Sequence, residues 1–545
     1  DPGVMGINYR CEPMRERLKI KNDPSHIFSS FVYGDPDTPV LETYPGEPIR
    51  IRLLDGAHEE QHVLNITGMP WRKEIADIKS PLVQSQTIGI SEAFNIQISE
   101  PYAAGDYLYY SGGIDDLWLG LWGIIRAYAV PHECLLPLCG MQPVAPVKTP
   151  PPSAVLRKFE IAAIQRELVY NRFGDHDPEG LLFVPLKQAR NIMCGKKEPA
   201  PLVIRANAGD WIEVTLHNLF DPKKPIKYHD YPSVPLEFPH EPSNRVSLSP
   251  QFLKYDPVCS SGINVGYNAS EQTAAPGECI KYLWHADREY GTVMLNSFGD
   301  LCNHRYHGLF GAIIIEPTGA LYYNGIHQTD ENYNENAVIT APGTETFREF
   351  VLFAHNGIRL LDKNNRIIKT TEQDLTGEEA SHEAPDHEDT GEKGYNYRSE
   401  RFLNRLKQIP AISKIFDSKV HGDPATPLLK SYVGERVIIR LLMPADKPRN
   451  ISFILHGHNW RAQPNDPLSS IVPVQGAVSV GNVFNIEPEP TKRRGDYLYR
   501  SGSLRWDVES GMWGIFRVMN RNIRCHCENV CRRVKKLRKK EKDKK

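Results

Sequence analysis

The sequence lacks several features that would assign it to a common class of protein. No run reaches about 18 apolar residues, the length of a membrane-spanning helix. Cysteine is scarce, with 10 among 545 residues, which excludes a small disulfide-stabilised scaffold. The phosphate-binding P-loop and the G-x-S-x-G nucleophile motif are also missing. No signal peptide is visible. The chain opens at Asp1-Pro2-Gly3 rather than at Met, so we expect a fragment or processed form of a longer protein.

Basic charge is concentrated at one end of the chain. Residues 532–545 hold ten Lys and Arg against two acidic residues, a local charge of +8, so the other 531 residues sum to −10. A nucleic-acid-binding protein would spread its basic charge over the folded surface, so we expect no nucleic-acid partner. The basic tail is typical of a solvated terminus, and an anionic surface is its alternative partner.

The composition predicts a globular chain of several domains. Apolar residues make up 40% and charged residues 24% of the sequence, and 545 residues suffice for about three or four domains. Pro-rich residues 142–153 and the region 318–346 are candidate boundaries. We therefore expect domains at 1–140, 141–318 and 319–524, followed by a Cys/His cluster and basic tail at 525–545. The acidic stretch 372–392 has the composition of an exposed loop.

An internal repeat is the strongest organisational signal. GINYR at 6–10 matches GYNYR at 394–398, and PGEPIRIRLL at 45–54 matches VGERVIIRLL at 433–442. GDYLYYSGG at 105–113 likewise matches GDYLYRSGS at 495–503. Because order and spacing agree, we expect the two segments to share one fold.

The patterning within the repeats is that of β-strands. Segments such as PIRIRLL, FNIQI and GDYLYY alternate with period two and are rich in β-branched and aromatic residues. Gly, Pro, Asp and Asn interrupt them every 8–15 residues. Residues 201–219 and 277–317, between the repeats, have the same pattern. The sequence therefore predicts an all-β chain of three tandem Greek-key β-sandwich or barrel domains.

Several of these motifs resemble the multicopper oxidase family, whose domains have the cupredoxin fold. The strand-turn-strand at 209–219 resembles the opening of a cupredoxin domain. HADREYG at 285–291, HGLFGAIIIEP at 307–317 and the GINYR openings resemble the large bacterial manganese oxidases, whose layout is similar to that of ceruloplasmin. The resemblance implies three tandem cupredoxin-like domains, copper as cofactor, and O2-dependent oxidation of Mn(II) as substrate. It also implies that this chain is roughly half of a six-domain oxidase.

The copper-ligand motifs of that family are incomplete here. The resemblance places the thiolate ligand of a type 1 copper at Ser111 in the first domain, Ala286 in the middle domain and Ser501 in the third. It places the downstream histidine ligand at Asp116 and Asp507. A type 1 site needs a thiolate with two imidazoles. We therefore expect the chain alone to be inactive by the family mechanism, with no catalytic or cofactor-binding residues of its own.

One cluster is a candidate metal site. His285, Asp287, Glu289, Asp300, Cys302, His304 and His307 fall within 23 residues of one expected hairpin and its loop. Mixed His and carboxylate ligands suit Mn2+, a hard ion. The alternatives are a polar loop in which Arg288 and Arg305 pair with the acids, or a residual copper site. The candidate metal ligands are His285, Asp287, Asp300, His304, His307 and, in the third domain, His456.

Two functions follow from the sequence. The first is a scaffold portion of a manganese-oxidising multicopper oxidase, with complete copper centres on further cupredoxin domains or partner subunits. The second is a cupredoxin-fold structural, metal-binding or partner-binding protein with no redox role. The resemblance implies a location outside the cytoplasm, at the cell or spore surface. The segment Cys525-His526-Cys527 with Cys531 is a further candidate for zinc or copper.

Overall fold

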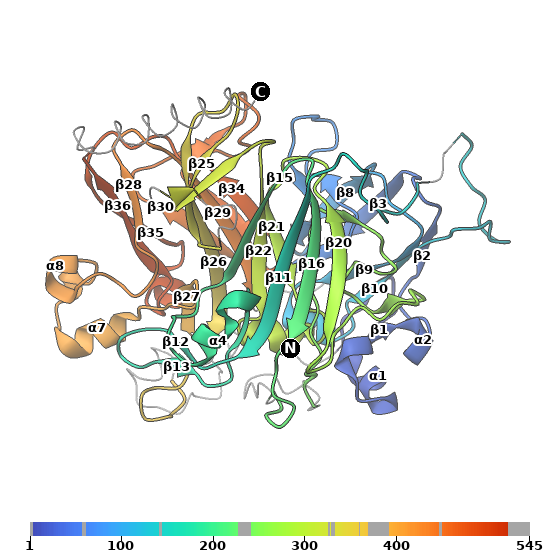
Figure 1. Ribbon diagram of the computed structural model, residues 1–545, viewed down its shortest axis with the longest axis horizontal. Coiled ribbons are helices and arrows are strands. Elements are labelled where there is room, and N and C mark those ends of the chain that lie inside the picture. The colour runs from blue at the N-terminus through green and yellow to red at the C-terminus, as the bar shows by residue number, and fades with distance from the viewer. Residues whose placement is uncertain are drawn as a thin grey trace.

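The chain folds into three β-sandwich units that follow one another along the sequence (Figure 1). The computed structural model describes residues 4–56, 61–140, 144–226, 241–324, 327–328, 333–358, 360–368, 392–445 and 450–520. Within this part the longest helix, α4 (Leu186–Met193), has eight residues. The predicted fold class, an all-β chain of three tandem units, is confirmed. The acidic stretch up to 391 and the whole segment 525–545 lie outside the described residues.

The first unit contains a five-stranded and a two-stranded sheet. The strand order of the larger sheet is β2 (Leu41–Thr43), β10 (Trp122–Ala127), β9 (Gly105–Ser111), β4 (His62–Ile66) and β7 (Ser85–Ile88). The smaller sheet pairs β3 (Ile49–Leu54) with β8 (Ala93–Ile98) in antiparallel register. Between the sheets lies a core that includes Ile66, Trp71 and Ile96.

The third unit repeats this arrangement. Its five-stranded sheet has the order β28 (Leu429–Tyr432), β36 (Trp513–Met519), β35 (Gly495–Ser501), β30 (Ile451–Leu455) and β33 (Val474–Val478). Each of these strands is the sequence counterpart of a strand in the first unit, in the same order. The second sheet runs β24 (His327–Gln328), β23 (Leu321–Asn324), β25 (Asn336–Thr340), β26 (Phe347–Ile358), β29 (Arg436–Ala445) and β34 (Val483–Ile486), and β27 (Glu392–Tyr395) also pairs with β26. The sheet order thus agrees with the internal repeat.

The second unit is built on the same plan. One sheet has the order β14 (Leu181–Pro185), β11 (Leu156–Gln165), β16 (Trp211–Asn218), β20 (Cys279–His285) and β18 (Lys254–Tyr255). The other has the order β15 (Leu202–Asn207), β22 (Phe310–Glu316), β21 (Gly291–Asn296) and β17 (Ser249–Pro250). Strands β20 and β21 lie in different sheets, so the connection between them crosses the sandwich. The antiparallel hairpin of this region is formed by β21 and β22, which are joined by the segment that carries α5 (Leu301–Tyr306).

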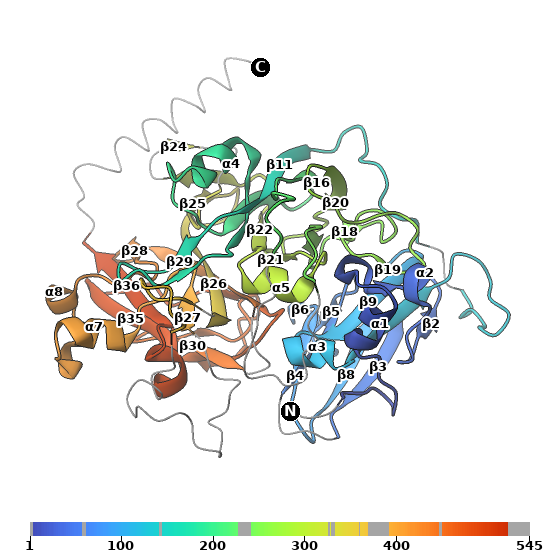
Figure 2. The same ribbon diagram turned by 90° about the horizontal axis from the view of Figure 1, so that it is seen from below.

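The three units lie side by side (Figure 2). They share apolar cores at their boundaries. One cluster joins Met14, Leu18 and Trp122 of the first unit to Phe298 and Leu301 of the second. A larger cluster joins strands β11, β14 and β22 of the second unit to β26 and β29 of the third. In the described part of the chain, no helix is long and apolar enough to cross a membrane.

Four charged side chains form a buried network between the second and third units. Arg205 on β15 and Arg440 on β29 both donate to Glu349 on β26, at 2.6 Å and 2.9 Å. Arg440 also reaches Glu316 on β22 at 3.3 Å. All four side chains are at most 4% exposed. Each charge has therefore lost its water and depends on the others for compensation.

The network sets the ionisation of its two carboxyl groups. Burial would raise the pKa of Glu349, but the guanidinium groups of Arg205 and Arg440 outweigh this and lower it. Burial and the neighbouring Glu349 charge raise the pKa of Glu316 well above its usual range. Glu349 is thus the ionised partner that holds both arginines.

We expect Arg440→Met to destabilise the chain strongly, because it leaves the Glu349 carboxylate with one of its two guanidinium partners. Breaking a buried ion pair costs about 3–5 kcal/mol. The matched control is Arg52→Met, which removes the equivalent but exposed arginine of the first unit and should change stability by less than about 0.5 kcal/mol. Urea unfolding followed by circular dichroism measures both. Equal losses in the two variants would contradict the network's role.

Candidate metal positions

The positions of the first unit that the resemblance assigns to type 1 copper ligands hold a hydrogen-bonded serine and aspartate. Ser111 ends strand β9, and the chain turns directly into α3 (Ile114–Trp118), which carries Asp116. The Ser111 hydroxyl donates to the Asp116 carboxylate. His62 on β4 contacts the same carboxylate oxygen through Nδ1 at 3.0 Å. Ser111 and Asp116 are buried, so a carboxylate, a hydroxyl and an imidazole share one enclosed position.

The third unit has the same pair with a different cation. The Ser501 hydroxyl, at the end of β35, donates to the carboxylate of Asp507 in the short helix Leu504–Val508. The other carboxylate oxygen of Asp507 accepts from Lys393 Nζ at 2.9 Å. Lys393 lies on β27, and its side chain is 1% exposed. The buried ammonium of Lys393 thus compensates the charge of Asp507, as His62 compensates that of Asp116 in the first unit.

These donor sets do not fit a type 1 copper ion. Such a site requires a soft thiolate and two imidazoles, and serine supplies neither. In both units the aspartate carboxylate is already bound by a serine hydroxyl and by a cationic side chain or imidazole. A buried carboxylate needs such partners to offset its lost hydration.

The contact with Asp116 raises the pKa of the His62 imidazole. Burial alone would lower the pKa of His62, but the hydrogen bond to Asp116 and its charge outweigh burial and raise it. His62 therefore stays protonated to higher pH than an ordinary histidine, and its positive charge compensates that of Asp116.

The candidate ligands of the second unit are separated by strand β21. His285, at the end of β20, stacks on Trp211 with 4.8 Å between ring centroids. Asp287 accepts a hydrogen bond from Tyr290 and forms an ion pair with Arg288 at 3.2 Å. The Arg288 pairing is the one that the polar-loop alternative predicts for this segment.

The other three candidates of this unit lie at α5 (Leu301–Tyr306). Asp300 caps the helix by accepting from the Asn303 amide. The buried His304 uses both ring nitrogens: Nδ1 lies 2.9 Å from the Ser297 hydroxyl and Nε2 lies 2.8 Å from the Ser243 carbonyl oxygen. His307 Nδ1 contacts Asp177 at 2.9 Å. Both ring nitrogens of His304 are therefore hydrogen-bonded within the protein.

His456 lies apart from these residues, in the third unit. Its Nε2 accepts from Arg500 Nε at 2.9 Å. Burial, followed by the Arg500 charge, lowers its pKa. Over the described ranges, no three His, Cys, Asp or Glu side chains gather as a group that could hold a metal ion.

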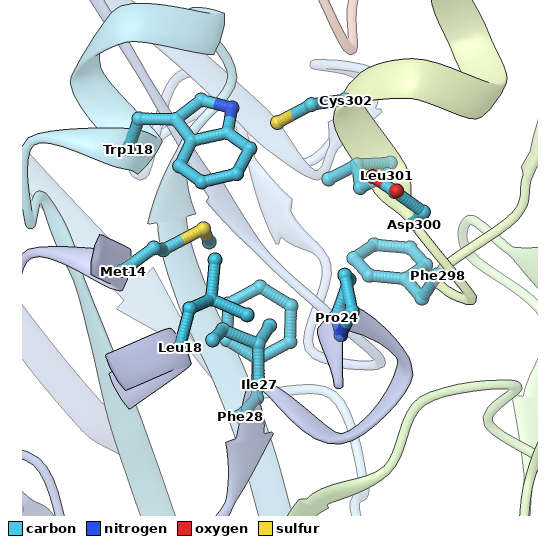
Figure 3. Close-up of a pocket in the computed structure, with 10 residues that line it drawn as sticks. All are labelled: Met14, Leu18, Pro24, Ile27, Phe28, Trp118, Phe298, Asp300, Leu301 and Cys302. Atoms are coloured by element: carbon cyan, nitrogen blue, oxygen red, sulfur yellow. The ribbon is translucent and has the colours of Figure 1, made fainter. Parts of the chain in front are cut away.

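Asp300 and Cys302 instead line a small, mostly apolar cavity between the first and second units (Figure 3). Met14 and Leu18 of α1 (Met14–Ile20) lie across the cavity from α5. The Cys302 sulfur points toward the Trp118 ring. This environment is that of a domain contact, since apolar side chains make up most of its lining.

Several residues of these positions escaped the sequence analysis. Lys393 and Asp177 are distant in sequence from their partners, and no motif marks them. His355 on β26 is fully buried, and burial, with nearby His307 and Arg305, lowers its pKa to about 3. The cysteines Cys259 and Cys279 are free thiols in the structure.

Comparison with known proteins gives no family assignment. No model of a known protein family matches the chain. No curated protein is similar to it in sequence. A crystal structure of a multicopper oxidase is 16% identical, covers 68% of this chain and 92% of its own, and superposes with a TM-score of 0.39. Copper nitrite reductase from Nitrosomonas europaea is also 16% identical, covers 67% and 95%, and gives 0.39. These sequence identities and TM-scores are too low to assign a function.

We expect Asp116→Asn to lower the pKa of His62 below that of an ordinary histidine, because burial then acts without the compensating charge. Histidine-selective NMR titration measures the shift. His456 is the internal control and should titrate unchanged.

The same contact makes stability depend on pH. Because the folded pKa of His62 is raised, its contribution is complete below the unfolded value of about 6.5 and is lost as pH rises through the folded pKa. This loss should disappear in the Asp116→Asn variant. An unchanged His62 titration in that variant would contradict the assigned contact.

Proposed function

We propose that this chain is a scaffold portion of a larger multicopper-oxidase-like protein and has no redox role of its own. One observation carries the proposal: two units place a serine-aspartate pair, neutralised by a histidine or a lysine, where the family places copper ligands. The same replacement at two repeats argues for a stable structural substitute rather than two independent losses.

The serine-aspartate pair of each of these two units connects neighbouring structural elements. In the first unit, the Ser111 hydroxyl accepts from the Val63 amide and donates to Asp116. It thereby ties the end of β9 to β4 and to α3. In the third unit, Lys393 and Asp507 tie β27 to the short helix after β35. Hydrogen bonds and ion pairs thus hold the end of each sandwich together, as metal coordination does in a copper-binding domain.

A substrate and an oxidant can also be proposed for the larger protein. The resemblance of residues 285–291 and 307–317 to manganese oxidases supports Mn(II) as its substrate and O2 as its oxidant. The copper centres would then lie on other domains or subunits, and this chain would hold those domains in position. The same resemblance supports a location outside the cytoplasm, at the cell or spore surface.

We expect the purified chain to bind no stoichiometric copper after loading and to show no intense blue absorption band. Elemental mass spectrometry and an absorption scan measure both. Stoichiometric copper with a strong blue band in the unmodified chain would contradict the proposal.

A restored site tests whether the positions are assigned correctly. In the third unit, Met512 is already present, and Ile451, Ser501 and Asp507 stand where the family has His, Cys and His. The variant Ile451→His/Ser501→Cys/Asp507→His, with Lys393→Met to remove the buried cation, should gain a blue copper band. The matched control keeps Ser501, has no thiolate and should stay colourless. Circular dichroism verifies that both variants are folded.

A further inference from the structure

Among the described residues, one buried arginine lacks the carboxylate partner that the others have. Six arginines in this part of the chain are buried. Five of them form an ion pair with a glutamate at distances between 2.6 Å and 2.9 Å: Arg17, Arg205, Arg401, Arg405 and Arg440. The sixth, Arg305 on α5, is 2% exposed and forms no ion pair within the described ranges. Burying a charge without a direct partner is costly.

Arg305 lies where the three units meet. Helix α5 belongs to the second unit and lies between the first and the third (Figure 2). Burial raises the pKa of Tyr110 in the first unit, and the Arg305 charge opposes this. Burial lowers the pKa of His355 in the third unit, and the charges of His307 and Arg305 lower it further. The guanidinium group of Arg305 therefore acts on a side chain of each neighbouring unit.

The unpartnered atoms of Arg305 are the two nitrogens of one guanidinium edge. Among the described residues, neither Nε nor Nη2 has a hydrogen-bond partner. In Arg436, the same two nitrogens donate to the two carboxylate oxygens of Glu487, at 2.7 Å and 2.8 Å. Arg348 binds Glu435 in the same way, at 2.8 Å and 3.2 Å. The Nε–Nη2 edge thus presents two parallel N–H donors that fit a planar group with two oxygens.

A second unpartnered side chain adjoins Arg305. His355 is 1% exposed, and neither of its ring nitrogens has a hydrogen-bond partner in the part of the chain that the structure describes. Its ring lies 6.5 Å from the Tyr306 ring and 5.6 Å from the Phe310 ring, between centroids. At His355 the register of β26 shifts against both β27 and β29, and such irregularities re-aim side chains next to functional sites. An uncharged imidazole donates one N–H without adding a second positive charge.

The carboxylates close to α5 bind other groups. Asp177 contacts His307 Nδ1 at 2.9 Å. Asp300 accepts from the backbone amide and the side-chain amide of Asn303, at 3.3 Å and 3.0 Å. Arg305 therefore has no direct counter-ion among the described side chains. A buried polar group without a partner is a place where a bound ion is expected.

We infer that Arg305 binds a small planar oxyanion at the junction of the three units. The anion places two oxygens on the Nε–Nη2 edge of Arg305 and faces His355, which donates a further hydrogen bond. Its class is a small carboxylate or an anion of the same shape, such as bicarbonate, because the buried position leaves no place for a bulky group. The anion enters when α5 and β26 separate locally, so its exchange is slow. This inference goes beyond the proposed scaffold function and does not rest on it.

Equilibrium dialysis of the full chain against radiolabelled formate tests the inference directly. We expect saturable binding of one formate per chain after prolonged incubation. Arg305→Met should abolish binding. Arg305→Lys, which keeps the charge but loses the Nε–Nη2 edge, should weaken it at least tenfold and serves as the test if Arg305→Met does not fold. Arg436→Met removes an arginine that is already bound to Glu487; it is the matched control and should leave formate binding unchanged.

Urea unfolding separates a binding role of Arg305 from a purely structural one. Formate should raise the unfolding midpoint of the unmodified chain above that measured in the same concentration of chloride, because a ligand of the folded state stabilises it. Arg305→Met should lose this gain. Without formate, this variant should be at least as stable as the unmodified chain, because it removes a buried charge that has no partner. Arg405→Met, which leaves Glu400 without its arginine, should instead be strongly destabilised.

Ion chromatography of the anions released when the purified chain is denatured identifies an anion acquired during expression. A planar oxyanion released in equal amount to the chain supports the inference. The inference is overturned if formate does not bind and no planar oxyanion is released, or if Arg305→Met leaves binding unchanged. It is also overturned if chloride competes as strongly as formate, because a spherical ion does not need two parallel donors. Copper takes no part in these measurements, so failure here is distinct from failure of the proposed function.

Discussion

The contact between Arg440 and Glu349 is the constraint on which the arrangement of the units depends. It joins β29 to β26 within the third unit, and Arg205 and Glu316 extend it into the second unit. Two buried arginines and two buried carboxyl groups, of which Glu349 is the ionised one, accept few alternative geometries, because any displacement leaves one of them without a partner. The apolar core around them supplies most of the burial, and the charges fix the register of one sandwich against the next.

The same physical rule explains the positions that the family resemblance assigns to copper ligands. A buried carboxylate in the first and third units is offset by a serine hydroxyl and by His62 or Lys393, so each sandwich end is closed without a metal ion. A chain held together in this way suits a structural role.

Much of the fold follows from the sequence, since period-two patterning and an aligned repeat specify strands and their order. The aligned repeat also located Ser111, Asp116, Ser501 and Asp507 correctly enough for the structure to bring each pair together. The cations were missed, since Lys393 reaches Asp507 across 114 residues of sequence. Arg52 and Arg440 occupy aligned positions of the repeat but differ in burial, because neighbouring elements decide exposure and no local pattern reports those neighbours.

The most direct test of this account compares amide hydrogen exchange in two aligned strands of the same chain, residues 49–54 and 437–442. In an antiparallel pair, alternate amides point away from the partner strand. The account predicts that alternate amides of β3 exchange rapidly, while those of β29, which is paired on both edges, are protected throughout. Equal protection of the two strands would contradict the strand pairing of the account, in which β3 pairs with β8 among the described residues and β29 pairs with both β26 and β34.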